Sequence, residues 1–324
     1  MSSHQIVGID VAAKKLVVAG ACAALRPEYA NDRDGRGRLV KALSGAKPIR
    51  VVVEATGIYF LDLACELAAA GIEVMVVNPR ASHHFAEAVL QRRKDDPVDA
   101  AMLRQYGQRM PFVPWAAPAE NLFALRAIGR EIGAQTKAAT AAKNRLHALR
   151  ATARAPRQLI RLLERQIAQL EALIDEFVAA AVKLIHDDPE LTRKFDLTDG
   201  VPGFAAKAVV AVMGELALLP PMSASQWTAH AGLDVRERRS GTSVQSQPRI
   251  SKRGNKRLRE ALFYPALTAA RCCPPAAAFV KRLTARGKTP LQAQVALMRK
   301  LLLAIHALWQ TNEPFNATKL FATT

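Results

Sequence analysis

The stretch QIVGIDVAAKKLVVAGAC, residues 5–22, decides the class of fold. Apolar residues alternate with other residues through 5–11, which is the pattern of a β-strand, and 14–22 predicts a second strand close enough behind to form a hairpin. Further along, the apolar runs 49–55 and 72–78 predict two more strands, and helical stretches follow each of them. We therefore expect an α/β domain whose sheet carries helices on its faces.

The segments between these strands complete the domain. A third strand is expected near 28–32, and the polar, charged stretch NDRDGRGR (31–38) comes before a short helix. Helices are expected over 37–44, 58–70, 80–90 and 97–108. The pattern changes after the Pro-containing stretch 110–118, so the first domain is predicted to span 1–112.

Residues 120–186 predict two long antiparallel helices separated at Pro156, because Gly and Pro are otherwise found there only at 129 and 133. The apolar positions of the second helix step by four and three, which is the spacing of a coiled-coil seam. These positions are Leu159, Leu163, Ile167, Leu170, Ile174, Phe177, Ala181 and Leu184. The sequence thus predicts a coiled-coil region over 113–190 and a mostly helical third region over 191–324.

Charge points to a polyanionic partner. The 324 residues include 46 Lys and Arg against 28 acids, a net charge of +18. Nucleic acid is the commonest such partner, and an anionic membrane surface is the alternative. No apolar run of about 18 residues indicates a membrane span. The N-terminus does not resemble a signal peptide, and the four cysteines show no metal or disulfide spacing, so a cytoplasmic, nucleoid-associated protein is expected.

Basic residues concentrate in two places. Ten Lys and Arg but only three Glu lie between 120 and 165, and nine Lys and Arg lie between 236 and 259, in a loop that Gly and Ser interrupt. A run of charge is often only a solvated face, but neutralising phosphates requires such residues. The candidate nucleic-acid-binding residues are Arg145, Arg150, Arg154, Arg157, Arg238, Arg239, Lys252, Arg253 and Lys256.

Four carboxylates form a candidate metal site. Asp10 ends the first strand and Glu54 ends a very apolar strand, where burying a lone acid is costly. Asp96 and Asp99, in QRRKDDPVDAAML (91–103), share one helix face. A bland interpretation makes Asp96 an N-cap, with Pro97 at the first helical position and Asp99 completing a box-like start. Four oxygen donors that converge would instead suit Mg²⁺ or Mn²⁺.

These motifs, taken in order, resemble those of a known family. GIDVAAKKL, EATGIY, VNPRASHHFA and KDDPVDAAML are similar to the DEDD transposases of the bacterial insertion-sequence one-ten family, which are related to the Piv/MooV invertases. The resemblance implies a RuvC-like (RNase H-like) domain with Asp10, Glu54, Asp96 and Asp99 as its catalytic, metal-binding acids. Asp95 falls outside the pattern and is expected to be a solvated acid.

The C-terminal half carries the resemblance further, through AGL, SGTS and ISKRGNKRLREAL. It implies a transposase domain whose nucleophile is Ser240, with Ser243 as the nearby competitor. In this family both domains form the active site jointly, often with the serine from another protomer. The resemblance therefore implies a dimer or tetramer, with the long helices of 113–190 as the dimerising element. The resemblance also implies donor and target DNA as substrates and a structured guide RNA encoded by the element.

Alternatives remain open from the residues alone. A metal-only RuvC-like nuclease or junction resolvase would use the four acids and water, and a non-catalytic nucleic-acid-binding protein would treat the acids as caps. Gly200-x-Pro-Gly203 resembles a helix-hairpin-helix turn whose amides face a phosphate, and an ordinary turn between helices explains it equally well.

Overall fold

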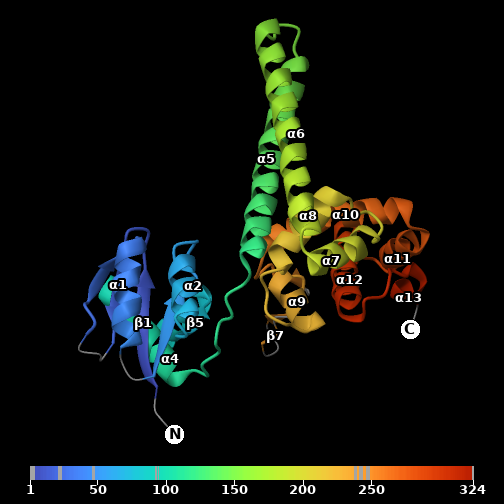
Figure 1. Ribbon diagram of the computed structural model, residues 1–324. Helices are drawn as coiled ribbons and strands as arrows, with labels where there is room; N and C mark the ends of the chain where they lie inside the picture. The colour runs from blue at the N-terminus through green and yellow to red at the C-terminus, as the bar shows by residue number, and fades with distance from the viewer. Residues whose placement is uncertain are drawn as a thin grey trace. The chain divides into compact units, whose positions relative to one another are not determined.

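The chain forms two compact units, Met1–Ala117 and Pro118–Thr324 (Figure 1). The computed structural model describes residues 4–20, 24–45, 48–91, 93, 95–236, 239–240, 244–245 and 249–322, with side chains for all of them except 239–240 and 244–245. The sequence predicted three regions. The structure joins the long helices to the C-terminal region because the first of them packs against a helix of that region.

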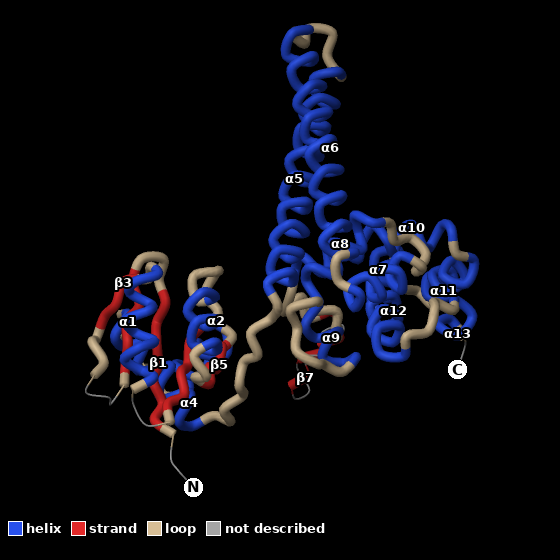
Figure 2. The backbone as a smooth tube through the Cα atoms, viewed as in Figure 1, coloured by secondary structure: helices blue, strands red, loops and turns tan. Residues whose placement is uncertain are grey.

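The first unit is built on one five-stranded sheet (Figure 2). Its strands are β1 (Gln5–Val11), β2 (Lys15–Ala19), β3 (Glu28–Ala30), β4 (Ile49–Glu54) and β5 (Glu73–Val77), in the order β3-β2-β1-β4-β5. β1 pairs antiparallel with β2 and parallel with β4. The predicted hairpin, the third strand and the two later strands are all confirmed.

Four helices accompany this sheet: α1 (Arg33–Ser44), α2 (Leu61–Ala69), α3 (Pro79–Ala88) and α4 (Asp96–Arg109). α1 begins earlier than predicted, because the Asp32 side chain caps it by accepting from the backbone N–H of Gly35 at 2.7 Å. The N-cap of α4 is Asp95 and not Asp96, since the Asp95 carboxylate accepts from Val98 N at 3.0 Å. Asp95 is therefore a capping residue, and Pro97 is the second helical residue.

Two glycines set the close approach of α4 to the sheet. A Cβ on Gly8 of β1 would lie 2.1 Å from the carbonyl oxygen of Ala100, and a Cβ on Gly107 would lie 2.5 Å from a methyl of Val52. The last turns of α4 thus cross the beginning of β1 and the middle of β4, while its first turns lie toward the carboxyl end of β1. The helix N-terminus is thereby carried to the strand ends that bear Asp10 and Glu54.

The second unit begins with the predicted pair of long helices, α5 (Glu120–Arg150) and α6 (Arg157–His186), which Pro156 separates as the N-cap residue of α6. The seam of α6 is used within the chain, because Leu163, Ile167, Ile174 and Ala181 are buried in cores that also contain side chains of α5. Leu159, at the far end, is 41% exposed. The seam therefore holds the hairpin together, and contact with a second chain would need another face.

The remaining helices surround one large core. They are α7 (Pro189–Asp199), α8 (Ala206–Leu216), α9 (Ala224–Ala231), α10 (Lys256–Cys272), α11 (Pro274–Ala285), α12 (Pro290–Thr311) and α13 (Ala317–Phe321). By length and composition α12 could cross a membrane, which the sequence pattern did not suggest. Ten of its side chains are buried, so in this fold α12 serves as a core helix.

Four short paired strands lie in the segment that connects α9 to α10. β6 (Val235–Arg236) pairs with β9 (Arg249–Ile250), and β7 (Arg239–Ser240) pairs with β8 (Val244–Gln245), each antiparallel. This segment, residues 235–250, is called the serine hairpin below. Its two ends therefore leave and rejoin the helical body close together.

The turn between α7 and α8 behaves as an ordinary connection. The amides of Gly200, Val201 and Phe204 donate to carbonyls of α7 and of the turn itself. Gly203 has φ +89°, and a Cβ there would lie 2.1 Å from the carbonyl oxygen of Pro265, so the turn packs against α10. These contacts favour the structural interpretation of the Gly200–Gly203 motif over a phosphate-binding one.

Candidate active site

Asp10 and Glu54 end neighbouring strands at the same level. Ile9 of β1 lies beside Val53 of β4 in the parallel register, so the next residue of each strand is one of the two acids. The side chains before them, Val7, Ile9, Val51 and Val53, are fully buried. The apolar core therefore fixes the backbone beneath both carboxylates, which are themselves half-buried at the carboxyl ends of their strands.

The N-terminus of α4 adds the other two acids. The pKa of Asp10 is raised to about 6, mainly by burial and then by the charges of Asp96, Asp99 and Glu54, in that order. The charges of the other three predicted acids therefore all act on Asp10, and the four acids are called the acid cluster below. With Asp95 acting as the cap, the bland explanation of Asp96 as the helix cap is removed.

Two hydroxyl groups orient Glu54. Thr56 Oγ1 donates to one carboxylate oxygen at 2.8 Å, and the hydroxyl of Ser82, near the start of α3, donates to the other. Sequence reasoning missed both residues. Thr56 stands two positions after the acid in EATG, which gave a local hint, whereas Ser82 is brought in by the fold from 28 residues away.

One of the four acids, Asp96, forms an ion pair with a lysine. Lys15, at the start of β2, makes an ion pair with Asp96, and both side chains are about two-fifths exposed, at 43% and 42%. The hydrogen bond and charge of Asp96 raise the pKa of Lys15. The sequence analysis did not single out Lys15, because a lysine opening a strand looks like ordinary surface.

The four acids fit a hard divalent ion in donor type, and the ammonium group of Lys15 at Asp96 shows that the site attracts a cation. Among the residues that the structure describes, no three of these acids bring ligand atoms as close together as the exposed His83, His84 and Glu87 on α3, whose ligand atoms lie within 4.8 Å of one another. The acid cluster is thus prearranged by its backbone, with its carboxylates still apart.

Ser240 lies on β7 of the serine hairpin, where its backbone pairs with Val244. Its side chain and that of Arg239 are not described, and Arg238 and Ser243 lie outside the described residues. The root of the hairpin is held by the side chain of Ser251, which donates to Asp234 Oδ1 at 2.5 Å. This hydrogen bond fixes the point at which β9 leads back to the helical body.

The predicted nucleic-acid-binding residues that the structure describes with side chains are all exposed. Arg145, Arg150, Arg154 and Arg157 gather near the far end of the α5–α6 hairpin, where Arg150 pairs with Glu164 at 2.5 Å. Lys252, Arg253 and Lys256 lie just after the serine hairpin. These two groups are separate basic surfaces of the second unit.

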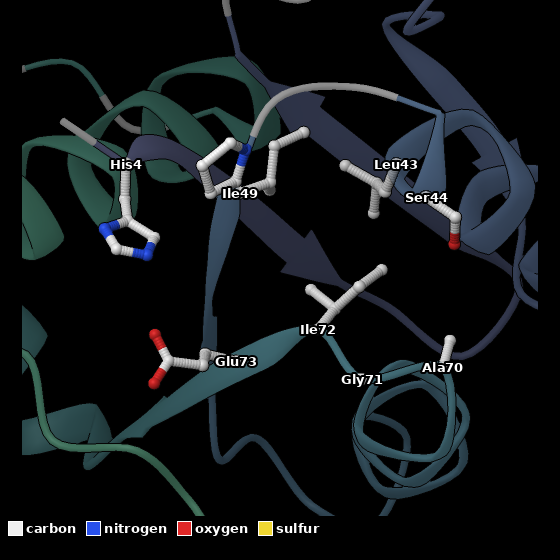
Figure 3. Close-up of a pocket in the computed structure, with 9 residues that line it drawn as sticks. His4, Leu43, Ser44, Ile49, Ala70, Gly71, Ile72 and Glu73 are labelled. Carbon is white, nitrogen blue, oxygen red and sulfur yellow. The ribbon is translucent and has the colours of Figure 1, made fainter. Parts of the chain in front are cut away.

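A shallow pocket of about 270 Å³ lies at the other end of the first unit's sheet (Figure 3). His4, Ile49 and Glu73 line it, next to the amino ends of β1, β4 and β5. The Glu73 carboxylate accepts from Arg50 Nε at 2.6 Å. Because the acids stand at the carboxyl ends of β1 and β4, this pocket is not part of their site.

Comparison with known proteins identifies the family. Residues 7–149 match a DEDD transposase family of the IS110 type, described as "Transposase", and residues 196–281 match the "Transposase IS116/IS110/IS902 family". The pilin gene-inverting proteins of Moraxella lacunata and Moraxella bovis are each 31% identical over 273 residues, which is 83% of this chain and 82% of the relative. This chain belongs to the IS110 family of transposases.

The IS110 family gives the site its chemical class. The chain is a DNA transposase or recombinase, and its first unit has the RNase H-like fold that the DEDD family implies. DEDD transposase domains typically depend on a divalent metal ion. An interpretation of the protein as a non-catalytic binder is therefore excluded.

Proposed function

We propose that this IS110-family enzyme cuts and rejoins DNA strands of an insertion sequence through a covalent serine–DNA intermediate. Asp10, Glu54, Asp96 and Asp99 would hold Mg²⁺ or Mn²⁺, and Ser240 would be the nucleophile. The observation that supports the proposal is that Asp10 and Glu54 end neighbouring strands and that the charges of Asp96, Asp99 and Glu54 help raise the pKa of Asp10 to about 6.

The proposed reaction balances without a co-reactant. Ser240 Oγ attacks the phosphorus of a phosphodiester, an Oγ–P bond forms, and the bond from phosphorus to the departing deoxyribose oxygen breaks. That oxygen takes up a proton, and the serine hydroxyl gives one up. The hydroxyl of the incoming strand then attacks the phosphoserine and releases Ser240. A divalent ion, when bound, supplies Lewis-acid polarisation of the phosphoryl oxygens.

The chain's own residues provide the remaining functions. Thr56 and Ser82 hold both oxygens of Glu54, which keeps that carboxylate in one orientation. Arg238 and Arg239 come directly before the nucleophile in sequence and would stabilise the developing phosphoryl charge. Gly241 follows Ser240 and lets the backbone approach the phosphate closely.

Donor and target DNA would contact the two basic surfaces, and we further propose a structured guide RNA that pairs with both. The net charge of +18 supports a large phosphate-binding surface. Binding to DNA would place the enzyme in the cytoplasm, at the nucleoid. The exposed side chains Leu159, Leu162 and Leu173 on α6 give the α5–α6 hairpin a face for a dimer or tetramer.

A metal-only nuclease is the second candidate, because all four acids belong to the first unit and need no residue of the second. It would use water as the nucleophile and leave Ser240 idle. The discriminating experiment is a denaturing gel of labelled DNA after cleavage by wild type, Ser240→Ala and Ser243→Ala. We expect a protein–DNA adduct in wild type and Ser243→Ala and none in Ser240→Ala. Cleavage without any adduct would favour the nuclease.

A further inference from the structure

A buried ion pair lies beside Asn255, where the serine hairpin leads into α10. The Glu215 side chain of α8 is only 4% exposed and accepts two hydrogen bonds from Arg130 of α5, from Nε at 2.8 Å and Nη2 at 3.2 Å. Asn255, the N-cap residue of α10, donates to the same carboxylate at 2.7 Å. These bonds occupy both oxygens of Glu215 and keep its pKa low despite its burial.

The region around Glu215 holds more positive charge than the Glu215 carboxylate can balance. Arg126 lies one turn before Arg130 on α5, and Arg257 lies two residues after Asn255. Arg126 Nε is buried and has no hydrogen-bond partner. Burial lowers the pKa of Arg126, and the charges of Arg130 and Arg257 lower it further, against the opposing effect of Glu215. Arg126 and Arg130 therefore both act on the Glu215 carboxylate, and the charge of Arg257 acts on Arg126.

His230 adds an unpartnered nitrogen to this group. Its Nε2 atom is buried and has no hydrogen-bond partner, and burial, with Arg126 nearby, lowers its pKa. Buried polar atoms are rarely left without partners, so each such atom needs an explanation. Arg126, Arg257 and His230 together are called the basic pocket below.

The basic pocket lies where the serine hairpin joins the body. The amide of Asn255 donates to the carbonyl oxygen of His230 at 2.7 Å, which closes the root of the hairpin. A Cβ on Gly254 would lie 2.2 Å from that oxygen, so the two ends pack against each other directly. From Arg236 to Ser240 the chain spans at most about 13 Å at a strand's rise per residue.

We propose that the basic pocket binds a backbone phosphate of the DNA strand that Ser240 attacks, and so fixes that strand beside the nucleophile. The inference rests on the proposed function. Guanidinium groups pair with phosphate oxygens through short, directed hydrogen bonds, and such contacts set the register of a strand on a protein. A bound phosphate would give Arg126 Nε an acceptor and would supply the negative charge that Glu215 alone lacks.

The test compares two exposed arginines of the same helix, Arg257 in the pocket and Arg271 in the last turn of α10. Binding of the full-length protein to a fluorescent DNA duplex is measured by anisotropy across a range of NaCl concentrations. Arg257→Gln should weaken binding several-fold and reduce the slope of log K against log salt by about 0.9, the value for one phosphate contact. Arg271→Gln should leave both nearly unchanged.

Arg126→Gln, checked for folding by circular dichroism, should repeat the Arg257→Gln result. Equal effects of Arg257→Gln and Arg271→Gln would overturn the proposal, as would a loss confined to RNA binding. Because anisotropy does not depend on chemistry, these outcomes are independent of whether an adduct forms. If wild type forms the protein–DNA adduct but Arg257→Gln binds DNA like wild type, only the phosphate site is rejected. If wild type forms no adduct, the serine mechanism is rejected.

Discussion

The acid cluster of the first unit and the basic pocket of the second unit are built alike with opposite sign. In the first, Asp10, Glu54, Asp96 and Asp99 repel one another, and Lys15 balances one of them. In the second, Glu215 pairs with Arg130, and the charges of Arg130 and Arg257 both act on Arg126. A fold retains like charge close together at a cost, so each cluster suits a ligand of opposite charge, and we propose a divalent cation for one and a phosphate for the other.

The largest effect is expected from removing a member of the acid cluster. Asp10→Asn should abolish DNA cleavage, because the site loses one of its four negatively charged oxygen donors. DNA affinity, measured by anisotropy, should stay largely intact since the basic surfaces lie in the other unit. Loss of binding and folding together with cleavage would show that Asp10 has a structural role.

A smaller effect is expected from the hydroxyls that orient Glu54. Thr56→Val and Ser82→Ala should each lower metal affinity or cleavage by about 10- to 100-fold, the usual range for groups that orient a metal ligand. Ser44→Ala, which removes a hydroxyl bonded only to its own helix, is the matched control. Full cleavage activity and metal affinity in both variants would mean that Glu54 needs no support.

The pH dependence of stability should also report on the cluster. The pKa of Asp10 is raised from 3.8 to about 6, so its contribution is fully present below about pH 4 and is lost as the pH rises through 6. The loss amounts to about 1 to 2 kcal/mol after allowance for screening by solvent. In metal-free buffer Asp10→Asn should therefore remove this slope and unfold at a higher temperature than wild type at pH 7. An unchanged slope in thermal unfolding would contradict the repulsion.

The smallest effects are expected on the exposed basic surface of the α5–α6 hairpin. Arg154→Gln should weaken nucleic-acid binding only a few-fold and reduce the salt slope by less than Arg257→Gln does. The comparison contrasts an arginine at the far end of the α5–α6 hairpin with one beside the buried Arg126 and His230. A larger loss for Arg154→Gln than for Arg257→Gln would reverse that ranking.

Patterns along the chain predicted most of the first unit, because strand alternation and strand-ending acids are local signals. The start of α1 was placed too late because the stretch 31–38 is polar and charged, whereas Asp32 supplies a side-chain cap that starts the helix within it. The N-cap of α4 was assigned to Asp96 and is in fact Asp95. Either of two adjacent acids can accept the backbone N–H, and the sequence does not show which one does.

The features that sequence could not give depend on contacts between distant segments. Ser82 reaches Glu54 across 28 residues, and Arg130 reaches Glu215 across 85. No spacing rule connects such residues, since the sheet and the helical core bring them together. The role of the α6 seam was also ambiguous, because the same heptad spacing serves a helix within the chain or a second chain.

A titration of Mn²⁺ into the full-length protein, followed by calorimetry, tests the central claim most directly. Asp95 and Asp96 offer a matched pair, since Asp95→Asn keeps a good N-cap while Asp96→Asn removes a proposed ligand, and each variant loses one negative charge. We expect wild type and Asp95→Asn to bind Mn²⁺ similarly and Asp96→Asn to bind it far more weakly. Equal binding by all three, or no binding by wild type, would contradict a metal site at these four acids.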